Sequence, residues 1–331
     1  MRNKLPEAGA LRVCVGFSGG LDSTVLLHLL AAERVSTGVL LSAAHVHHGL
    51  NPQADAWVRH CRAICRQLEV PFQLRRVLVS RAPRTSLEEE ARTARYAALA
   101  ALRADVLALA HHADDQAETL LLQLLRGAGP KGLAGMAALK PLVGAGFKRK
   151  SGREARKNAW HVAASPTLLW RPLLDCTRAE LEAYALRHQL VWIDDDSNLD
   201  VRFKRNFVRA QVLPVLTAGF PAPVATLARA ARHQADAASL AEALADIDLT
   251  GSRRGAGLAI APLLVLDDVR LKNLLRRWLA QHGLRQPSEA RLLALVRALR
   301  QSSNDTRLAW QHEGGVVRRT KGLLHCSQGA A

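Results

Sequence analysis

Residues 12–23 join an apolar run to a short Ser/Gly turn that opens directly into a helical pattern. The turn reads Ser18-Gly-Gly-Leu-Asp-Ser23. Glycine lets the backbone approach an anion closely, and the first N–H groups of the following helix have no partner within the helix, so they can point at a negative ligand. A strand, this turn and a helix in succession predict the first unit of an α/β domain with a phosphate site at the turn.

Asp22 narrows the kind of ligand expected at this turn. A carboxylate is a poor partner for bare phosphate, but a cation such as Mg²⁺ can bridge the two. The turn is neither Gly-x-x-x-x-Gly-Lys-[Ser/Thr] nor Gly-x-Gly-x-x-Gly, which excludes the functions associated with those motifs. For the hexapeptide alone, an ordinary tight turn with a helix cap is the alternative.

From residue 11 to about 125, apolar runs alternate with amphipathic stretches. The apolar runs occupy 11–17, 38–46, 72–79 and 105–110, and the helical patterns occupy 22–33, 52–69, 86–103 and 114–126. Strands that alternate with helices are typical of a parallel sheet, in which ligands bind outside the carboxyl ends of the strands. The sequence therefore predicts an α/β fold whose motif-bearing loops meet at one edge of the sheet.

A glycine-rich stretch and a basic run interrupt this pattern after residue 127. The basic run lies at 148–157, and we expect a mobile loop over 145–160 that is either a solvated insertion or a nucleic-acid contact.

A boundary is expected at Gly219-Phe-Pro-Ala-Pro223, after helical spacing that resumes at 177–189 and around 202–216. The prediction is a catalytic domain over 1–218 and a second, smaller, mainly α domain over 219–327.

The charge balance points to a polyanionic partner. Lysine and arginine outnumber aspartate and glutamate by 46 to 29, which gives a formal charge of +17. Nucleic acid is the first candidate, and an anionic membrane surface is the competing interpretation. No apolar run approaches spanning length and the N-terminus lacks a signal peptide's apolar stretch, so we expect a cytoplasmic protein with no membrane partner. The five cysteines include no Cys-x-x-Cys pair, which argues against a disulfide framework.

A second chemical motif, His111-His-Ala-Asp-Asp-Gln-Ala-Glu-Thr119, follows the fourth apolar run. In a helix that starts near Asp114, Asp115 and Glu118 are three residues apart and share a face. Two carboxylates beside a phosphate site can hold Mg²⁺, or can bind and deprotonate an amine. The alternative is that the acids only complement the helix N-terminus.

Five histidines at strand ends also raise the hypothesis of a Zn²⁺ site, which the missing cysteines disfavour. They are His45, His47, His48, His111 and His112.

Taken in order, the motifs resemble those of one family. They are Ser18-Gly-Gly-Leu-Asp-Ser23, His45-Val-His-His-Gly-Leu50, Ala91-Arg-Thr-Ala-Arg-Tyr96, His111-His-Ala-Asp-Asp-Gln-Ala-Glu-Thr119, Leu124-Leu-Arg-Gly-Ala-Gly129, Gly132-Leu-Ala-Gly-Met136, Arg171-Pro-Leu-Leu174, Trp192-Ile-Asp-Asp-Asp-Ser-Asn198, Arg205-Asn206-x-x-Arg209 and Val212-Leu-Pro-Val-Leu216, followed by the segment from Arg270 to Leu324. This series is similar to that of the tRNA(Ile)-lysidine synthetase family, which belongs to the N-type ATP pyrophosphatases. The resemblance covers nearly the whole chain.

The resemblance implies a PP-loop, Rossmann-like fold of the adenine nucleotide alpha hydrolase type, with a parallel five-stranded type of sheet. It also implies a carbon–nitrogen ligase of tRNA processing. Such an enzyme uses ATP and Mg²⁺ to adenylate the wobble cytidine of an isoleucine tRNA with a CAU anticodon. Free L-lysine then displaces AMP to give lysidine.

The resemblance further implies roles for individual residues. The ATP-binding residues would be Ser18, Gly19, Gly20, Leu21, Asp22 and Ser23. The catalytic residues would be Asp22, which would hold Mg²⁺, Asp115, Glu118 and Arg126. The lysine-binding residues would be His112, Asp115 and Glu118, of which any one could be the base. The tRNA-binding residues would be Lys148, Arg149, Lys150, Arg202, Arg205 and Arg209, although surface solubility is the alternative for Arg205 and Arg209.

The chain departs from the family pattern in a few places. Asn51 stands where an arginine is frequent and Asp196 where a proline is frequent. The chain stops soon after its second domain, so we expect the extra C-terminal domain of longer relatives to be absent.

Three other functions agree less well with the sequence than the ligase does. A tRNA thiolase would need cysteine pairs, an amidotransferase-type synthetase would need an ammonia-source domain, and a non-catalytic RNA-binding protein would have no use for acids near a phosphate site. The sequence leaves the oligomeric state open, a homodimer included.

Overall fold

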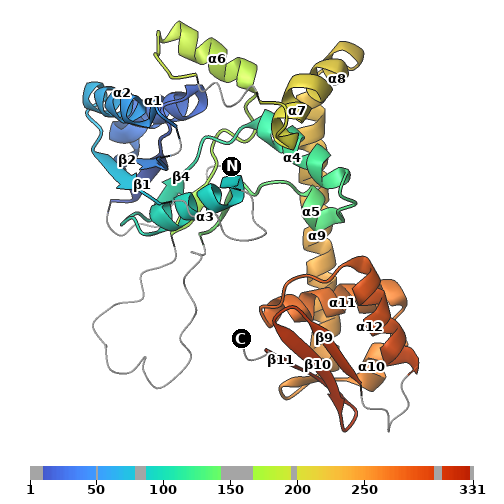
Figure 1. Ribbon diagram of the computed structural model, residues 1–331. Helices are drawn as coiled ribbons and strands as arrows, with labels where there is room; N and C mark the ends of the chain where they lie inside the picture. Colours follow the sequence, from blue (N-terminus) through green and yellow to red (C-terminus); the bar gives the residue numbers. More distant parts are fainter. Residues whose placement is uncertain are drawn as a thin grey trace, which may run out of the picture. The chain divides into compact units, whose positions relative to one another are not determined.

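The computed structural model describes residues 10–49, 51–78, 87–142, 167–194, 200–301 and 308–328 (Figure 1). The chain divides into two compact units, Met1–Arg232 and His233–Ala331. The division falls inside the long helix α9 (Pro223–Ser252), later in the chain than the boundary predicted at residue 219.

The first unit is built on a six-stranded sheet with the order β3-β2-β1-β4-β6-β5. Its strands are β1 (Arg12–Gly16), β2 (Leu40–His47), β3 (Phe72–Arg76), β4 (Val106–Ala108), β5 (Leu139–Pro141) and β6 (Leu168–Trp170). Strands β3, β2, β1, β4 and β6 pair in parallel, and β5 runs antiparallel along the edge beside β6. The predicted α/β fold with a parallel sheet is confirmed; three of the four predicted apolar runs contain β1, β3 and β4, and the fourth, 38–46, covers all of β2 except His47.

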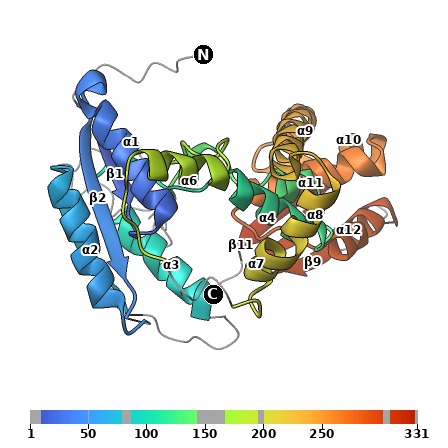
Figure 2. The same ribbon diagram turned by 90° about the horizontal axis from the view of Figure 1, so that it is seen from above.

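Helices cover both faces of this sheet (Figure 2). They are α1 (Leu21–Thr37), α2 (Ala54–Gln67), α3 (Leu87–Ala100) and α6 (Arg178–Arg187). Successive residues of a strand point to opposite faces, so Val13 and Val15 pack with α1, α2 and α6, whereas Cys14 packs with α3. Two hydrophobic layers therefore fix the sheet and the loops that leave it.

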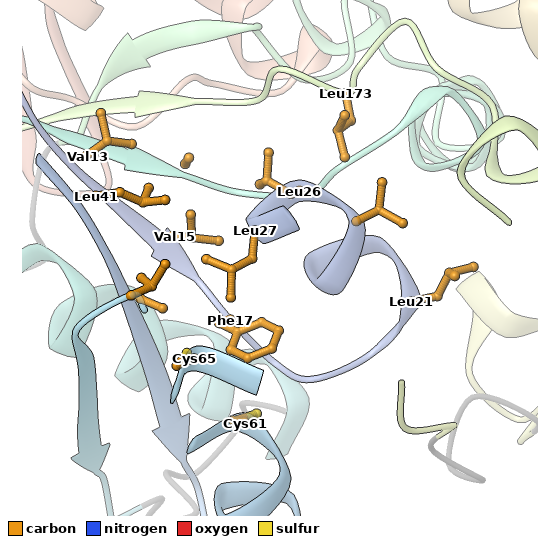
Figure 3. Packing of buried hydrophobic residues seen from close by; sticks show 14 of the residues in the cluster. Val13, Val15, Phe17, Leu21, Leu26, Leu27, Leu41, Cys61, Cys65 and Leu173 are labelled. Carbon is orange, nitrogen blue, oxygen red and sulfur yellow. The ribbon is translucent and has the colours of Figure 1, made fainter. Parts of the chain in front are cut away.

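The core reaches up to the first motif-bearing loop. Phe17 and Leu21 stand at the two ends of the Ser/Gly turn, and both side chains belong to the buried cluster that contains Leu26 and Leu27 of α1 (Figure 3). Phe17 is 1% exposed and Leu21 is 4% exposed. The turn is thus anchored in the core at both ends.

The strand order creates a crevice beside β1. The chain runs outward from β1 to β2 and β3, and then returns to place β4 on the other side of β1. Connections that leave neighbouring parallel strands in opposite directions open a crevice at their carboxyl ends, where ligands bind. The loops after β1 and β4 flank this point.

Further helices complete the first unit after β4. They are α4 (Ala113–Leu124), α5 (Pro130–Leu133), α7 (Lys204–Phe207), the π-helix η3 (Val208–Val212), α8 (Leu213–Gly219) and the start of α9. Val208 and Leu213 pack against Ala117 of α4 in a small buried cluster. The segment 204–219 is thereby held against α4.

The second unit combines helices with an antiparallel sheet. Its elements are β7 (Arg253–Arg254), β8 (Gly257–Ala259), α10 (Ile260–Val265), α11 (Asp268–Gln281), α12 (Glu289–Gln301), β9 (Ala309–His312), β10 (Gly315–Thr320) and β11 (Leu323–Gln328). The sheet order is β7-β8-β11-β10-β9, and leucines of α11 and α12 form one buried cluster with Trp278 of α11. The expected smaller and mainly helical domain is confirmed, with this sheet as an addition.

Within the described residues, no single helix is long and apolar enough to cross a membrane. One pair, Lys204–Gly219 and Pro223–Ser252, meets the length and composition criteria together across a bend of 101°.

Candidate functional site

The turn after β1 is closed by its own serines. The Ser23 hydroxyl accepts hydrogen bonds from the N–H groups of Ser18 and Gly19, at 3.3 and 3.2 Å, and donates one to the Gly20 carbonyl at 3.0 Å. The Ser18 hydroxyl lies 3.0 Å from that of Ser23 and accepts a hydrogen bond from the Gly20 N–H. Ser23 is buried and holds the turn in shape, whereas Ser18 is exposed at its mouth.

Gly19 is required by both the backbone and the packing of the turn. Its φ is +90°, and a Cβ added there would lie 2.8 Å from Sγ of Cys61 in α2. The Gly19 carbonyl accepts a hydrogen bond from the Ile193 N–H at 2.9 Å. The turn is therefore fixed between α2 and the segment that follows α6.

Helix α1 begins at this turn with no side-chain cap. Gly20 is its N-cap residue and Asp22 lies in its first turn. The side chain of Leu21 faces the core, so this residue can offer a ligand only its backbone. An uncapped first turn beside two glycines is the arrangement that binds anions such as phosphate.

The imidazole of His112, which is 1% exposed, has three carboxylates around it. Its Nε2 lies 3.6 Å from Oδ2 of Asp22 and 3.6 Å from Oδ2 of Asp115, and its Nδ1 lies 3.4 Å from Oδ2 of Asp114. His112 is also the N-cap residue of α4, and its backbone N–H donates to Asp115 at 3.1 Å. The structure thus brings Asp22, from the first turn of α1, together with Asp115, from the first turn of α4.

These carboxylates give His112 a positive charge. Burial by itself lowers the pKa of His112, but Asp114, Asp22 and Asp115 outweigh burial and raise the pKa to about 10. Its neighbour His111 is affected in the opposite direction, because burial is the main cause that lowers its pKa. Nδ1 of His111 accepts a hydrogen bond from Nε of Arg171 at 3.2 Å. At neutral pH the two adjacent histidines therefore carry different charges.

Glu118 is 0% exposed and is held by two guanidinium groups. Nε of Arg205 donates to its Oε2 at 2.6 Å, and Nε of Arg209 donates to its Oε1 at 2.6 Å. Arg205 also donates from Nη2 to Oδ1 of Asp115 at 2.8 Å. Asp115 and Glu118 share a face of α4, and α7 and η3 pack against that helix. Arg205 and Arg209, which the sequence assigns to RNA, therefore have carboxylate partners inside the first unit.

A cavity of about 460 Å³ adjoins these charged groups. Two acids, Asp114 and Glu118, and two arginines, Arg178 and Arg209, contribute to its lining. The remaining lining residues are Leu213, Pro214, Thr217, Ala218 and Val224. Because the oxygens of Glu118 are covered by the arginines, Asp114 is the more accessible carboxylate of the cavity.

Several residues assigned from the sequence do not join this cluster. Arg126 follows the far end of α4, and at 1.5 Å per helical residue it lies on the order of 15 Å along the helix from Asp115. Arg202 is exposed and pairs with Asp200 at 2.7 Å. Lys148, Arg149 and Lys150, like the whole of the predicted loop 145–160, lie outside the described residues.

Two arginines belong to the site although the sequence analysis assigned them no role. Nη1 of Arg178, the first residue of α6, lies 3.8 Å from Oδ2 of Asp22, and its backbone N–H donates to Asp114 at 2.8 Å. Arg171, which is 3% exposed, binds His111 and the carbonyl of Ala137. The motif Arg171-Pro-Leu-Leu174 could have identified Arg171 as a site residue, whereas no local sequence pattern distinguishes Arg178.

The histidines proposed for Zn²⁺ have other surroundings. Nδ1 of His45 lies 2.9 Å from the Phe17 carbonyl and 3.5 Å from Sγ of Cys61, and His45 is buried. Across the part of the chain that the structure describes, no group of three or more His, Cys, Asp or Glu side chains is arranged to hold a metal ion.

Comparisons with known proteins give the same family over nearly the whole chain. A PP-loop domain family model matches residues 1–216, and a TilS substrate binding domain model matches residues 258–325. The tRNA(Ile)-lysidine synthase of Pseudomonas fluorescens (strain Pf0-1) is 43% identical over 335 residues, which cover 98% of this chain and 70% of that protein. The tRNA(Ile)-lysidine synthase of Pseudomonas aeruginosa is 45% identical over 332 residues, which cover 96% of this chain and 69% of that protein.

A solved structure, the U34-tRNA thiolase NcsA from Methanococcus maripaludis, matches with a TM-score of 0.48 and 16% identity, over 67% of this chain and 71% of that one. A likeness of this size carries no conclusion about function. The family models and the curated relatives do: the chain belongs to the tRNA(Ile)-lysidine synthase family.

Proposed function

We propose that the protein joins free L-lysine to the wobble cytidine of an isoleucine tRNA with a CAU anticodon. ATP would activate the cytosine carbonyl oxygen as an adenylate with release of pyrophosphate, and the lysine ε-amine would then displace AMP. The observation that carries this proposal is the contact of Asp22 with His112 and of His112 with Asp115, because it joins a phosphate loop to a cluster of acids across β1 and β4.

The ATP site proposed here is the turn from Ser18 to Ser23. Backbone N–H groups at an uncapped helix start, together with the exposed Ser18 hydroxyl, are suitable donors for phosphate oxygens. Arg178, near Asp22, is better situated than Arg126 to stabilise charge that develops on the phosphates.

Asp22 is the residue proposed to hold Mg²⁺. Its Oδ1 atom is buried and has no hydrogen-bond partner in the described part of the chain, which is the state expected of a carboxylate oxygen that binds a cation. When bound, Mg²⁺ would neutralise the phosphate charge that builds up as pyrophosphate leaves.

Free lysine fits the cavity beside the acids. Its walls offer carboxylates for an ammonium group, the Arg178 guanidinium for a carboxylate, and the apolar side chains of Leu213, Pro214 and Val224 for an aliphatic stem. The side-chain amine of free lysine has a pKa of ~10.4, so a carboxylate must both bind it and take up its proton before it can attack. His112 is itself a cation at neutral pH, so we assign it to the orientation of Asp22, Asp114 and Asp115.

The RNA partner follows from the family and from the charge of the chain. The second unit contains the match to the substrate binding domain, and the whole chain carries a formal charge of +17. Exposed cations such as Arg202, together with the basic run at 148–157, are the proposed phosphate contacts.

The test is lysine transfer to RNA. Purified protein is incubated with ATP, Mg²⁺, labelled lysine and unmodified CAU-anticodon isoleucine tRNA, and a tRNA without cytidine at the wobble position serves as the negative substrate. Asp22→Ala should abolish transfer and leave RNA binding within a factor of about two, whereas Asp175→Ala, which removes an exposed acid paired with Arg232, should retain activity. Absence of transfer by the unaltered protein, or full transfer by Asp22→Ala, would contradict the proposal.

A further inference from the structure

The segment 200–212 presents two chemically different faces. Its inner face carries Arg205 and Arg209, which bind Asp115 and Glu118 of α4. The exposed fractions of the two arginine side chains are 30% and 33%, so their outer edges remain accessible to solvent. The acids are covered far more completely, since Glu118 is 0% exposed.

The outer face has the composition of a single-stranded RNA contact. Phe203 and Phe207 are spaced one helical turn apart and are 46% and 49% exposed. Lys204 and Arg202 lie beside them and are exposed as well. Exposed aromatic rings interleaved with cations stack on unpaired bases and bind the neighbouring phosphates.

The inner face conflicts with amine binding at the same acids. Both oxygens of Glu118 and one oxygen of Asp115 already accept hydrogen bonds from guanidinium groups. An ammonium group cannot reach Glu118 while both arginines remain in place. The resting arrangement therefore keeps these two acids from the substrate.

We propose that Arg205 and Arg209 form a latch on Asp115 and Glu118, and that RNA docking on the outer face of segment 200–212 releases it. Released arginines bind phosphate oxygens, and the freed carboxylates accept the lysine ammonium. The inference rests on the proposed function and adds an order to it, because the amine site becomes complete only when RNA is bound.

The local backbone is suited to such a change. Helix α7 has four residues and continues into the five-residue π-helix η3, which contains Arg209. Short π-helical turns are frequent at functional sites. Conversion of this turn to α-helical bonding shifts the register by one residue, which rotates a side chain by about 100° around the helix axis. A rotation of that size takes Arg209 off α4 without unfolding the segment.

The latch has a thermodynamic consequence that can be measured. If the open state is a minor one, populated at about 0.1–10%, the apparent affinity for lysine is reduced by that fraction until RNA or a substitution removes the latch. By linkage, lysine must then tighten RNA binding by the same factor.

The experiment measures binding of labelled L-lysine by equilibrium dialysis without ATP, with and without unmodified CAU-anticodon isoleucine tRNA. In the unaltered protein, RNA should tighten lysine binding about tenfold or more. Arg209→Gln should tighten lysine binding about tenfold without RNA, and its further response to RNA should shrink. Arg187→Gln, which removes the same charge from an exposed site of α6, should behave like the unaltered protein.

Two results would overturn the latch. One is lysine affinity in the unaltered protein that does not change with RNA, a measurement that needs no variant. The other is weaker lysine binding by Arg209→Gln with and without RNA alike, which is what a purely structural role of the ion pair produces. If the unaltered protein neither transfers lysine to RNA nor binds lysine under any condition, the proposed function itself fails, and the latch fails with it.

Discussion

Replacement of His112 by glutamine tests whether its imidazole is a buried cation. A pKa raised from 6.5 to about 10 corresponds to about 5 kcal/mol of stabilisation at ~1.36 kcal/mol per unit, and the ring is 1% exposed, so solvent screening is small. Because the pKa is higher in the folded state, this stabilisation is complete below pH 6.5 and is lost as the pH rises through 10. The free energy of unfolding of the unaltered protein should therefore fall towards that of His112→Gln by about 1.4 kcal/mol per pH unit between pH 7 and 10.

The assay is urea unfolding of both proteins, followed by circular dichroism at several pH values from 7 to 9.5. Lysine, tyrosine and cysteine side chains titrate in both proteins, so the difference between the two curves isolates His112. Where the two units unfold separately, the transition that the substitution shifts is the one to compare. A difference that stays constant across this pH range would refute the reasoning, because it would mean that the folded protein does not hold the ring as a cation.

Three further substitutions have defined outcomes. Gly19→Ala should weaken nucleotide binding at least tenfold in a titration, because the new methyl group meets Sγ of Cys61 at 2.8 Å and φ is +90°. Glu118→Gln should lower the melting temperature of the first unit by about 4–8 °C, because the loss of a buried ion-pair partner costs about 2 kcal/mol when its arginine partners are partly exposed. Asp200→Asn, which removes the charge paired with the exposed Arg202, should cause a smaller shift. The Gln116 side-chain amide accepts a hydrogen bond from the Met136 N–H at 2.7 Å and donates one to the Met136 carbonyl at 2.9 Å. Gln116→Leu leaves both backbone groups without these partners, so it should destabilise the protein by about 2 kcal/mol in urea unfolding. An unchanged unfolding midpoint would show that these two hydrogen bonds do not contribute to stability.

The parallel sheet could be predicted because buried parallel strands leave continuous apolar runs in the sequence. The strands β5 and β6 could not be predicted in the same way. Each has three residues, and β5 is exposed along its whole length, so neither produces a periodic signal. Their positions are determined by pairing with β4 and with each other, which is a property of the assembled sheet.

Part of the site could likewise be predicted from local motifs, whereas the rest depends on contacts between residues far apart in the chain. The turn from Ser18 to Ser23 and the acids of α4 are local motifs, and the structure brings Asp22 and Asp115 to one histidine. The partners of Glu118 are 87 and 91 residues away in the chain. Spacing places Arg205 and Arg209 on one face of a helix, but only the packing of Val208 and Leu213 against α4 turns that face inward.

The serine hydroxyl that closes the first turn has a consequence for the energetics of ligand binding. Ser23 already accepts hydrogen bonds from two backbone N–H groups of the loop, so the loop has its binding conformation before any nucleotide is bound. Binding then requires little loss of loop entropy, which favours affinity through preorganisation. In Ser23→Ala the loop should be disordered until a nucleotide binds. Nucleotide binding by this variant should therefore have a less favourable entropy than binding by the unaltered protein, which calorimetry can measure.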